Sequence, residues 1–298
     1  MTDTAIPAVD PAGARPQARA LRRSGPRGPD RRLVGSIVAY TVLSLAAFIS
    51  IFPFFWMIVG TTNATVDIVQ GKASFGSHLW INIRNLFEQV NIPRVLFNSV
   101  YISVVATLLT LVVASAAGYA FEIFRNRWRE RIFAALLLML SIPFAALMVP
   151  LFVMMAGVGL INTYTAIIAP TIANIFVIFY FRQATKAFPH ELRDAAKIDG
   201  LKEWQIFLRV YMPVMRSTYA AATIIVFMLN WNNYLWPLIV LQTNDMKTLV
   251  LTISSLASAY TPDYGVVMVA TVLTTLPTLI IFFILQRLFV QGMLGSVK

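Results

Sequence analysis

The sequence has no cysteine, only two histidines and few charged residues. Without cysteine the chain can form neither disulfide bonds nor thiolate metal sites. His78 and His190 are too far apart in sequence to suggest a metal site, so we expect both to be solvated. Charged residues make up 12% of the chain, whereas hydrophobic residues make up 58%. A soluble domain cannot bury that much apolar surface, so the composition indicates a membrane protein.

Two further absences concern the source of energy. The chain lacks a phosphate-binding loop of the form G-x-x-x-x-G-K-S/T, since its one Gly-Lys pair, Gly71-Lys72, is followed by alanine. Any ATP hydrolysis must therefore be done by a partner. The long apolar runs also contain almost no ionisable residue, and Glu122 lies at the end of one. Ion-coupled carriers usually hold such residues at membrane depth, although backbone carbonyls can also bind sodium, so an ion-coupled carrier or channel is disfavoured without being excluded.

Long apolar runs make up most of the sequence after the N-terminal tail. About 20 apolar residues in a helix cross a bilayer. We predict six membrane helices, at Leu33–Gly60, Asn98–Phe124, Ile132–Met154, Tyr164–Phe181, Ser217–Leu241 and Val266–Leu288. The first run is too long for a cleaved signal sequence. The predicted fold is an all-α membrane domain over residues 33–290, between a basic tail, residues 1–32, whose composition predicts disorder, and a C-terminal tail, residues 291–298.

Basic residues are distributed unevenly among the connections. Twenty of the 24 Lys and Arg residues fall in the tail 1–32, the turn 125–131, the loop 182–216 and the C-terminal end. Because basic residues near span ends are retained in the cytoplasm, both termini and the 182–216 loop are predicted to be cytoplasmic. The net charge of +11 then reflects topology and anionic lipid rather than nucleic acid binding.

The loop 182–216 contains the stretch Pro189-His-Glu-Leu-Arg-Asp-Ala-Ala-Lys-Ile-Asp-Gly200. Pro189 suits the first turn of a helix, and acidic residues in that turn suit its positive end. Leu192, Ala195 and Ala196 then share a narrow face, and Gly200 breaks the helix.

A second short helix is predicted after this break. Asp199 can cap it, Trp204, Phe207, Leu208 and Tyr211 form an apolar stripe along it, and Pro213 ends or bends it. The residues alone are also compatible with an ordinary amphipathic surface loop.

This stretch, followed by Met212-Pro213, resembles the EAA loop of permease subunits of ATP-binding cassette (ABC) importers, in the maltose-type carbohydrate branch, where P-x-E-L-x-E-A-A-x-I-D-G-A is typical. Asp194 replaces the usual Glu, and Met212 replaces the Leu of the closing Leu-Pro. In that family the loop inserts into a cleft of the ATPase subunit. The resemblance implies coupling roles for Glu191, Asp194, Ala195, Ala196, Asp199, Gly200 and Pro213.

Other family-like stretches are Asn98-Ser-Val, Gly118-Tyr-Ala-Phe, Leu160-Ile-Asn-Thr163 and the C-terminal end of the chain. In maltose-type relatives the corresponding C-terminal tail reaches the ATPase pair. The resemblance therefore implies ATPase contacts for Gln291, Gly292, Gly295 and Lys298, with a flexible terminus as the alternative.

The resemblance implies a six-helix type I ABC importer permease that catalyses no covalent chemistry and works by alternating access. Its implied partners are a second homologous permease, two ATPase subunits and an extracytoplasmic substrate-binding protein. The chain itself would bind no cofactor, because ATP and Mg would be held by the ATPase subunits. The implied cargo is a sugar or oligosaccharide, with glycerol 3-phosphate or another polyol derivative as the alternative. An intramembrane enzyme is opposed by the lack of a suitably spaced nucleophile or metal cluster.

The fifth predicted span contains the polar run Asn230-Trp-Asn-Asn-Tyr-Leu-Trp-Pro237. Three amides at membrane depth are costly unless they face protein or water. Asn230, Asn233 and Pro237 would share one face of a continuous helix, and amides beside aromatic rings suit a hydroxyl-rich ligand. A similar N-W-N pattern occurs in carbohydrate-branch permeases. The candidate substrate-pathway residues are Asn230, Trp231, Asn233, Tyr234 and Trp236, and bonding between neighbouring helices is the alternative role for the amides.

Overall fold

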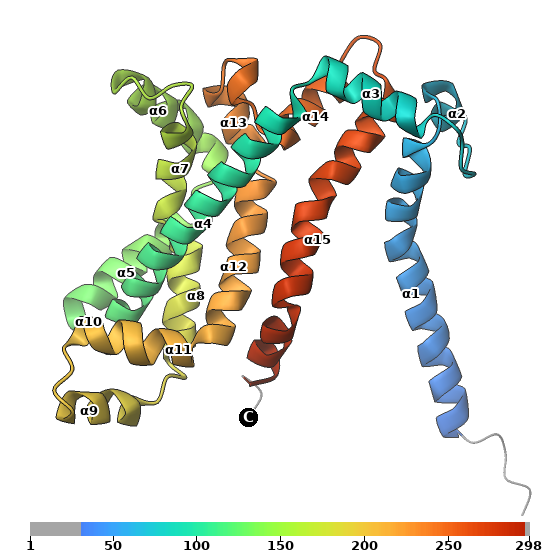
Figure 1. Ribbon diagram of the computed structural model, residues 1–298. Coiled ribbons are helices and arrows are strands. Elements are labelled where there is room, and N and C mark those ends of the chain that lie inside the picture. Colours follow the sequence, from blue (N-terminus) through green and yellow to red (C-terminus); the bar gives the residue numbers. More distant parts are fainter. Residues whose placement is uncertain (1–30, 296–298) are drawn as a thin grey trace, which may run out of the picture. The chain divides into compact units, whose positions relative to one another are not determined.

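The computed structural model describes residues 31–295, with side chains described over residues 35–287. This part of the chain is helical and contains no strand, so the predicted all-α fold is confirmed (Figure 1). The chain divides into two units, residues 1–53 and residues 54–298. The described residues of the first unit belong to α1 (Arg31–Thr61), an apolar helix that contains Pro53 near the unit boundary. Residues 1–30 of the predicted disordered tail lie outside the described residues.

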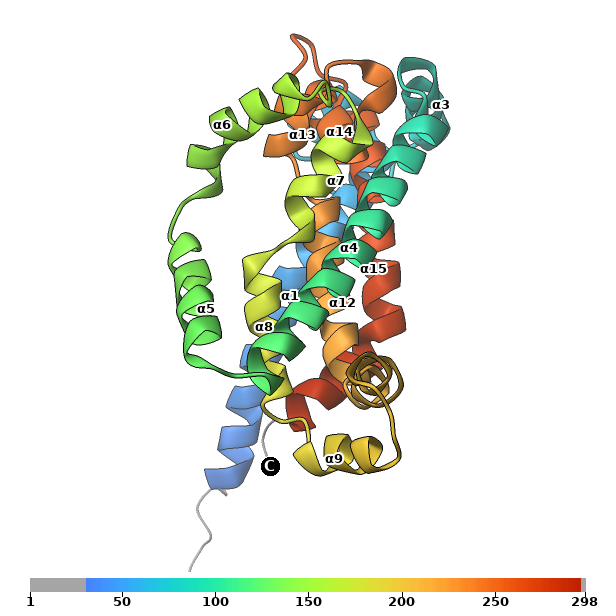
Figure 2. The ribbon, with the colours of Figure 1, turned by 90° about the vertical axis from the view of Figure 1, so that its left-hand side faces the viewer.

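Five helical stretches of the described chain are long and apolar enough to cross a membrane. They are Gly35–Thr61, Ile92–Ile123, Tyr164–Thr185, Arg216–Val240 and Tyr264–Arg287. A sixth is possible if α5 (Arg127–Met139) and α6 (Phe144–Gly157) form one span. The prediction of one continuous helix over residues 132–154 is wrong, because these two helices meet at 101° (Figure 2). Pro143 lacks an amide hydrogen and holds extended backbone just before α6, which explains the break.

Two other spans are also interrupted. α7 (Tyr164–Ile172) is followed by α8 (Ile175–Thr185), and Asn174 caps α8 by accepting a hydrogen bond from the Val177 amide at 3.1 Å. α12 (Arg216–Trp231) is likewise separated from α13 (Leu235–Val240) by a short non-helical segment. Each break exposes backbone groups that must find partners inside the bundle.

α4 (Ile92–Ile123) lies at the centre of the bundle and packs against α7, α8 and α12 (Figure 2). It begins six residues before the predicted span start at Asn98, because Asn91 caps it and Pro93 occupies its first turn. Its contact with α8 is very close at Gly118. A Cβ atom at that position would lie 2.7 Å from the Phe181 Cβ and 2.8 Å from the Arg182 amide nitrogen. Small residues allow such close helix packing in membranes.

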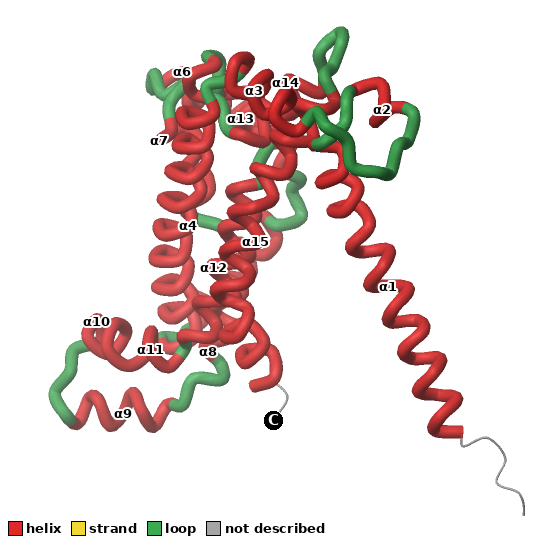
Figure 3. Tube along the Cα trace, turned by 45° about the vertical axis from the view of Figure 1, so that its right-hand side comes forward, coloured by secondary structure: helices red, strands yellow, loops and turns green. Residues whose placement is uncertain are grey.

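The two ends of the second unit carry different short helices. α2 (Thr65–Val69), α3 (Leu79–Gln89), the 3-10 turn η2 (Asn244–Met246) and α14 (Leu249–Ala257) lie at one end. The loop helices α9 (His190–Ile198), α10 (Glu203–Ile206) and α11 (Met212–Val214) lie at the other end. They are on the same side as the C-terminal end of α15 (Tyr264–Gly295) (Figures 1 and 3).

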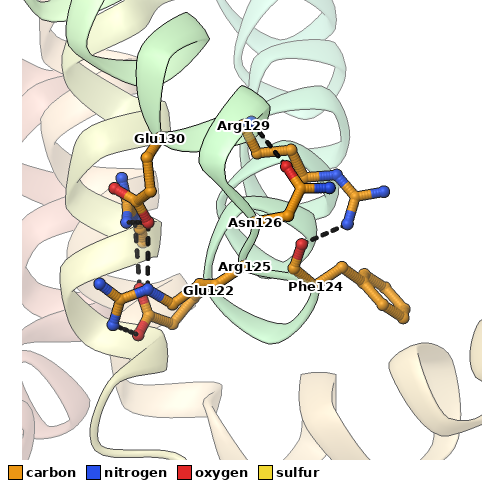
Figure 4. A network of polar contacts seen from close by, with 7 residues as sticks. Glu122, Phe124, Arg125, Asn126, Arg129 and Glu130 are labelled. Carbon is orange, nitrogen blue, oxygen red and sulfur yellow. Dashed lines mark hydrogen bonds and ion pairs between the residues drawn. The ribbon is translucent and has the colours of Figure 1, made fainter.

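A partly buried ion-pair network joins α4, α5 and α8 at the end of the bundle that carries α9 to α11. The Arg182 side chain is 5% exposed and donates to Glu122 at 3.2 Å and to Glu130 at 2.5 Å. Arg125 contacts the same two carboxylates (Figure 4). Glu122, noted in the sequence only as the end of a span, therefore helps to satisfy a buried guanidinium.

We predict that Gly118→Val destabilises the α4–α8 contact, because the larger side chain would overlap Phe181 and the α8 backbone. Overpacking of this kind costs about 1–3 kcal/mol. Thermal unfolding of the purified chain, followed by tryptophan fluorescence, should show a lower midpoint. Gly157→Val is the matched control, because a Cβ at Gly157 meets no atom within 4 Å. Equal midpoints for both variants would contradict the prediction.

Candidate functional site

The loop after α8 forms two helical segments, as predicted. α9 (His190–Ile198) is the first, and it follows Pro189 and carries Glu191 in its first turn. The second consists of α10 (Glu203–Ile206), the π turn η1 (Phe207–Tyr211) and α11 (Met212–Val214). Gly200 lies between them at φ +80°, a left-handed conformation that favours glycine.

Asp199 does not cap the second segment, so that prediction is wrong. It occupies the C-terminal cap position of α9, where its amide donates to the Ala195 carbonyl at 3.0 Å. The left-handed turn at Gly200 and the extended backbone at Lys202 separate Asp199 from the first amides of α10. The Gln205 side chain instead accepts a hydrogen bond from the Lys202 amide at 2.8 Å.

The second segment ends at Val214, directly after Pro213, as predicted. A wider turn precedes the proline, and there the Met212 amide donates to the Phe207 carbonyl, five residues back. A π turn accommodates a proline that lacks an amide hydrogen and would crowd the preceding turn. The wider turn also divides the predicted apolar stripe. Tyr211 is fully buried and Phe207 half-buried, whereas Trp204 and Leu208 are exposed.

The predicted coupling residues are mostly exposed at this end of the bundle. Glu191, Asp194, Ala195, Asp199, Gly200 and Pro213 are exposed, and Ala196 is buried. Large apolar side chains lie in the open beside them, with Ile198 88% exposed and Trp204 59% exposed. The face predicted for Leu192, Ala195 and Ala196 therefore turns only Ala196 inward. Large apolar side chains exposed together in one loop favour an interaction site there.

Charged residues of the loop, which we did not single out from the sequence, hold α9 in place. Arg193 donates to Glu203 at 2.6 Å, and the Lys197 ammonium lies 3.0 Å from the same carboxylate. Partial burial alone would raise the pKa of Glu203, but hydrogen bonds from Lys197 and Arg193 outweigh burial and lower it. The alternation of acidic and basic residues between 191 and 203 is the sequence pattern from which these ion pairs could have been predicted.

A second candidate site lies within the spans. A cavity of about 370 Å³ is lined by Thr110, Phe144, Pro170, Thr171, Asn174, Val226, Leu229, Asn230, Asn233 and Trp236. Three of these residues come from the breaks described above: Phe144 begins α6, Asn174 caps α8 and Asn233 separates α12 from α13. We call this cavity the break pocket.

The amides of the break pocket retain unused hydrogen-bonding capacity. The Asn233 side chain makes no hydrogen bond to any described residue, and it is half-buried. Asn230 donates to the Val226 carbonyl at 3.0 Å, which leaves its side-chain oxygen available. Asn174 uses its side-chain oxygen to cap α8, which leaves its amide nitrogen available. The break pocket thus offers donors and acceptors beside the Phe144 and Trp236 rings.

The structure brings together only three of the five predicted pathway residues. Asn230, Asn233 and Trp236 line the break pocket. Trp231 is buried elsewhere, stacks on Phe227 and donates to the Thr274 carbonyl of α15 at 3.0 Å. Tyr234 packs against an apolar cluster around Trp236.

The expected common face of Asn230, Asn233 and Pro237 does not exist, because the helix breaks between α12 and α13. Thr171 and Asn174 were not singled out from the sequence. Asn174 is a lone amide between apolar runs, four residues after Pro170, and this pattern could have predicted a polar site in this span.

The C-terminal prediction can be followed only in part. Gln291, Gly292 and Gly295 belong to the last turns of α15, so the helix continues through most of the predicted tail. Lys298 lies outside the described residues. Within the described part, no group of three or more His, Asp or Glu residues is arranged to hold a metal ion.

Comparison with known proteins places these features in a family. The family model described as "Binding-protein-dependent transport system inner membrane component" matches residues 106–295. The lactose transport system permease protein LacG of Rhizobium radiobacter is 65% identical over 268 residues, which cover 90% of this chain and 98% of the relative. The arabinooligosaccharides transport system permease protein AraQ of Halalkalibacterium halodurans is 37% identical over 258 residues, 85% of this chain and 92% of the relative.

The fold also has a solved counterpart. A crystal structure of a bacterial ABC transporter involved in the import of the acidic polysaccharide alginate matches with a TM-score of 0.75. The match covers 89% of this chain and 100% of that chain, at 19% sequence identity. At that identity the likeness supports the fold alone.

We predict that Glu203→Gln lowers stability in a pH-dependent way. Because the folded-state pKa of Glu203 is lowered, its stabilising contribution is present above the unfolded-state pKa of about 4.3 and is lost as the pH falls through the folded-state value. The midpoint of thermal unfolding should therefore differ between wild type and variant near neutral pH, and the difference should close in acid. A difference that does not change with pH would contradict this. Asp199→Asn is the control, because Asp199 is exposed and has no ion-pair partner among the described residues.

Proposed function

Because the chain belongs to the family of inner-membrane components of binding-protein-dependent transport systems, we propose that it is the permease subunit through which an ATP-driven importer moves a sugar or oligosaccharide into the cell. The observation that carries the cargo class is the 65% identity with the lactose system permease over nearly the whole of both chains. The chain provides the passage and, as a permease of this family, catalyses no reaction. ATP hydrolysis falls to other subunits, because the sequence has no phosphate-binding loop.

The proposed contact with the ATPase is the surface of α9 and α10. Ala195, Ile198 and Trp204 expose apolar surface there, and Glu191 and Asp194 add charge. Such a surface favours insertion into a groove of another protein over solvation. ATP and Mg would be held by the ATPase subunits. Gln291, Gly292, Gly295 and Lys298 would form a second ATPase contact.

The proposed assembly contains a second homologous permease, two ATPase subunits and an extracytoplasmic substrate-binding protein. The family description itself names a binding protein as part of the transport system. The basic residues of the 182–216 loop support a cytoplasmic position for α9, and with it cytoplasmic termini.

The break pocket is the proposed contact between this chain and its cargo. Free amide groups of Asn233, Asn230 and Asn174 suit the hydroxyls of a neutral sugar, and the Trp236 ring suits its apolar face. The described lining contains no Lys or Arg. A phosphate ester is normally bound by such cations, so the pocket favours a sugar over glycerol 3-phosphate. Alternating access would expose this pocket to the two sides in turn.

We predict that Ala195→Glu abolishes most sugar uptake by the reconstituted complex, because the exposed docking face of α9 would gain a bulky charge. Burying an unpaired charge costs several kcal/mol, enough to reduce ATPase binding by more than about tenfold. Co-purification of the ATPase and uptake of radiolabelled sugar are the measurements. Ala195→Ser, which keeps the side chain small, is the control. Undiminished co-purification with Ala195→Glu would remove α9 as the docking element.

We predict that Asn233→Ala raises the KM for uptake by about two- to tenfold, the effect of losing one hydrogen bond worth about 0.5–1.5 kcal/mol. Asn232→Ala is the matched control. Asn232 is the exposed neighbour, its amide donates to the Met228 carbonyl of its own helix at 2.9 Å, and it does not line the pocket. Equal kinetics for the two variants would show that the pocket does not contact cargo.

A further inference from the structure

Glu203, the first residue of α10, accepts contacts from two separate parts of the second unit. Arg193 and Lys197 approach its carboxylate from α9, at 2.6 Å and 3.0 Å. The Tyr119 hydroxyl approaches from α4 and donates to the other carboxylate oxygen at 3.2 Å. One carboxylate therefore joins the exposed helix α9 to the central helix of the bundle. Hydrogen bonds to an ionised acceptor are stronger than neutral ones.

Tyr119 is held by close packing, so a displacement of Glu203 would be transmitted through it to the bundle. It is 4% exposed, and its ring contacts those of Phe207 and Tyr211 at centroid distances of 5.3 Å and 4.8 Å. The fully buried Tyr211 in turn shares a 2.7 Å hydrogen bond with Thr185 of α8. The contact at Glu203 is thus continuous with the packed ends of both α4 and α8. Close-packed interiors transmit displacement because they deform little.

α9 has few other attachments. The Arg193 guanidinium also lies 5.5 Å from the centre of the Phe124 ring, at the end of α4. Among the described residues of α9, only Ala196 is buried and only Arg193 is half-buried. The chain enters α9 through the extended backbone of Pro189 and leaves it through Gly200, where an added Cβ atom would meet no neighbour within 4 Å. A helix tethered at such points can swing on its own unless side chains hold it.

We propose that Glu203 is a positioning residue for transport: it locks α9 to the end of α4, so that displacement of α9 moves the spans instead of being absorbed at Gly200. α4 also contributes Thr110 to the break pocket, which gives the displacement a route to the cargo site. The role in transport rests on the proposed function. The mechanical link itself does not, and it can be measured separately.

The mechanical link is tested with spin labels on the full-length chain in lipid nanodiscs. The chain has no cysteine, so His190→Cys on α9 and Val112→Cys on the exposed side of α4 can be labelled alone. The wild-type background should give one narrow distance distribution, and Glu203→Gln should broaden it. Glu88→Gln is the control, because it weakens the exposed Arg84–Glu88 pair on α3 and leaves α9 untouched. An equally narrow distribution in Glu203→Gln overturns the proposal.

The transport role is tested in the reconstituted complex by counting sugar molecules imported per ATP hydrolysed. With Glu203→Gln this ratio should fall by at least about fivefold, the lower end of ordinary coupling between sites, while ATPase co-purification stays unchanged. Tyr119→Phe should lower the ratio in the same direction, and Glu203→Asp, which keeps the charge, should restore part of it. A wild-type ratio in Glu203→Gln overturns the proposal. If the wild-type complex imported no sugar, the proposed function would fail, and the label distances would still decide whether Glu203 holds α9.

Discussion

The fold is governed by the requirement that backbone polar groups inside a lipid bilayer find partners within the protein. Continuous helices meet it unaided, but α5–α6, α7–α8 and α12–α13 are interrupted. Side chains from neighbouring helices satisfy carbonyls that a break or a proline leaves unpaired. Thr110 donates at 3.0 Å to the Thr171 carbonyl beside the α7–α8 break. Trp236 donates at 2.8 Å to the Ala166 carbonyl, which Pro170 cannot pair because it has no amide hydrogen. The breaks therefore concentrate polar side chains in one place, and the break pocket is the result.

The fold class follows from hydropathy and the general position of each span was predictable, but the breaks were not. A run that is apolar on all sides carries no periodic signal that distinguishes one helix from two shorter ones. Pro143 directly precedes α6, whereas Pro170 lies inside α7 without interrupting it. Whether a proline kinks or interrupts a helix depends on partners such as Trp236, which come from distant parts of the sequence.

In the 182–216 loop, too, some features follow from neighbouring residues and others depend on residues distant in the sequence. The position of α9 follows from Pro189, the acidic first turn and Gly200, which act within a few residues of one another. The contact of Glu203 with Tyr119 joins residues 84 positions apart and depends on how α4 and α8 pack. For the same reason Trp231, close in sequence to Asn230 and Asn233, belongs to the α12–α15 contact and not to the pocket. Local patterns locate helices and caps, whereas the pairing of side chains requires the packed bundle.

The central claim is that this subunit couples ATP hydrolysis by separate subunits to the movement of a sugar. The most direct test is sugar uptake into proteoliposomes that contain the complete complex and its binding protein, measured with ATP, with a non-hydrolysable analogue, and with ionophores that collapse proton and sodium gradients. We expect uptake with ATP alone, none with the analogue, and no effect of the ionophores. Uptake that persists without ATP hydrolysis, or that stops when the ion gradients collapse, would contradict the account.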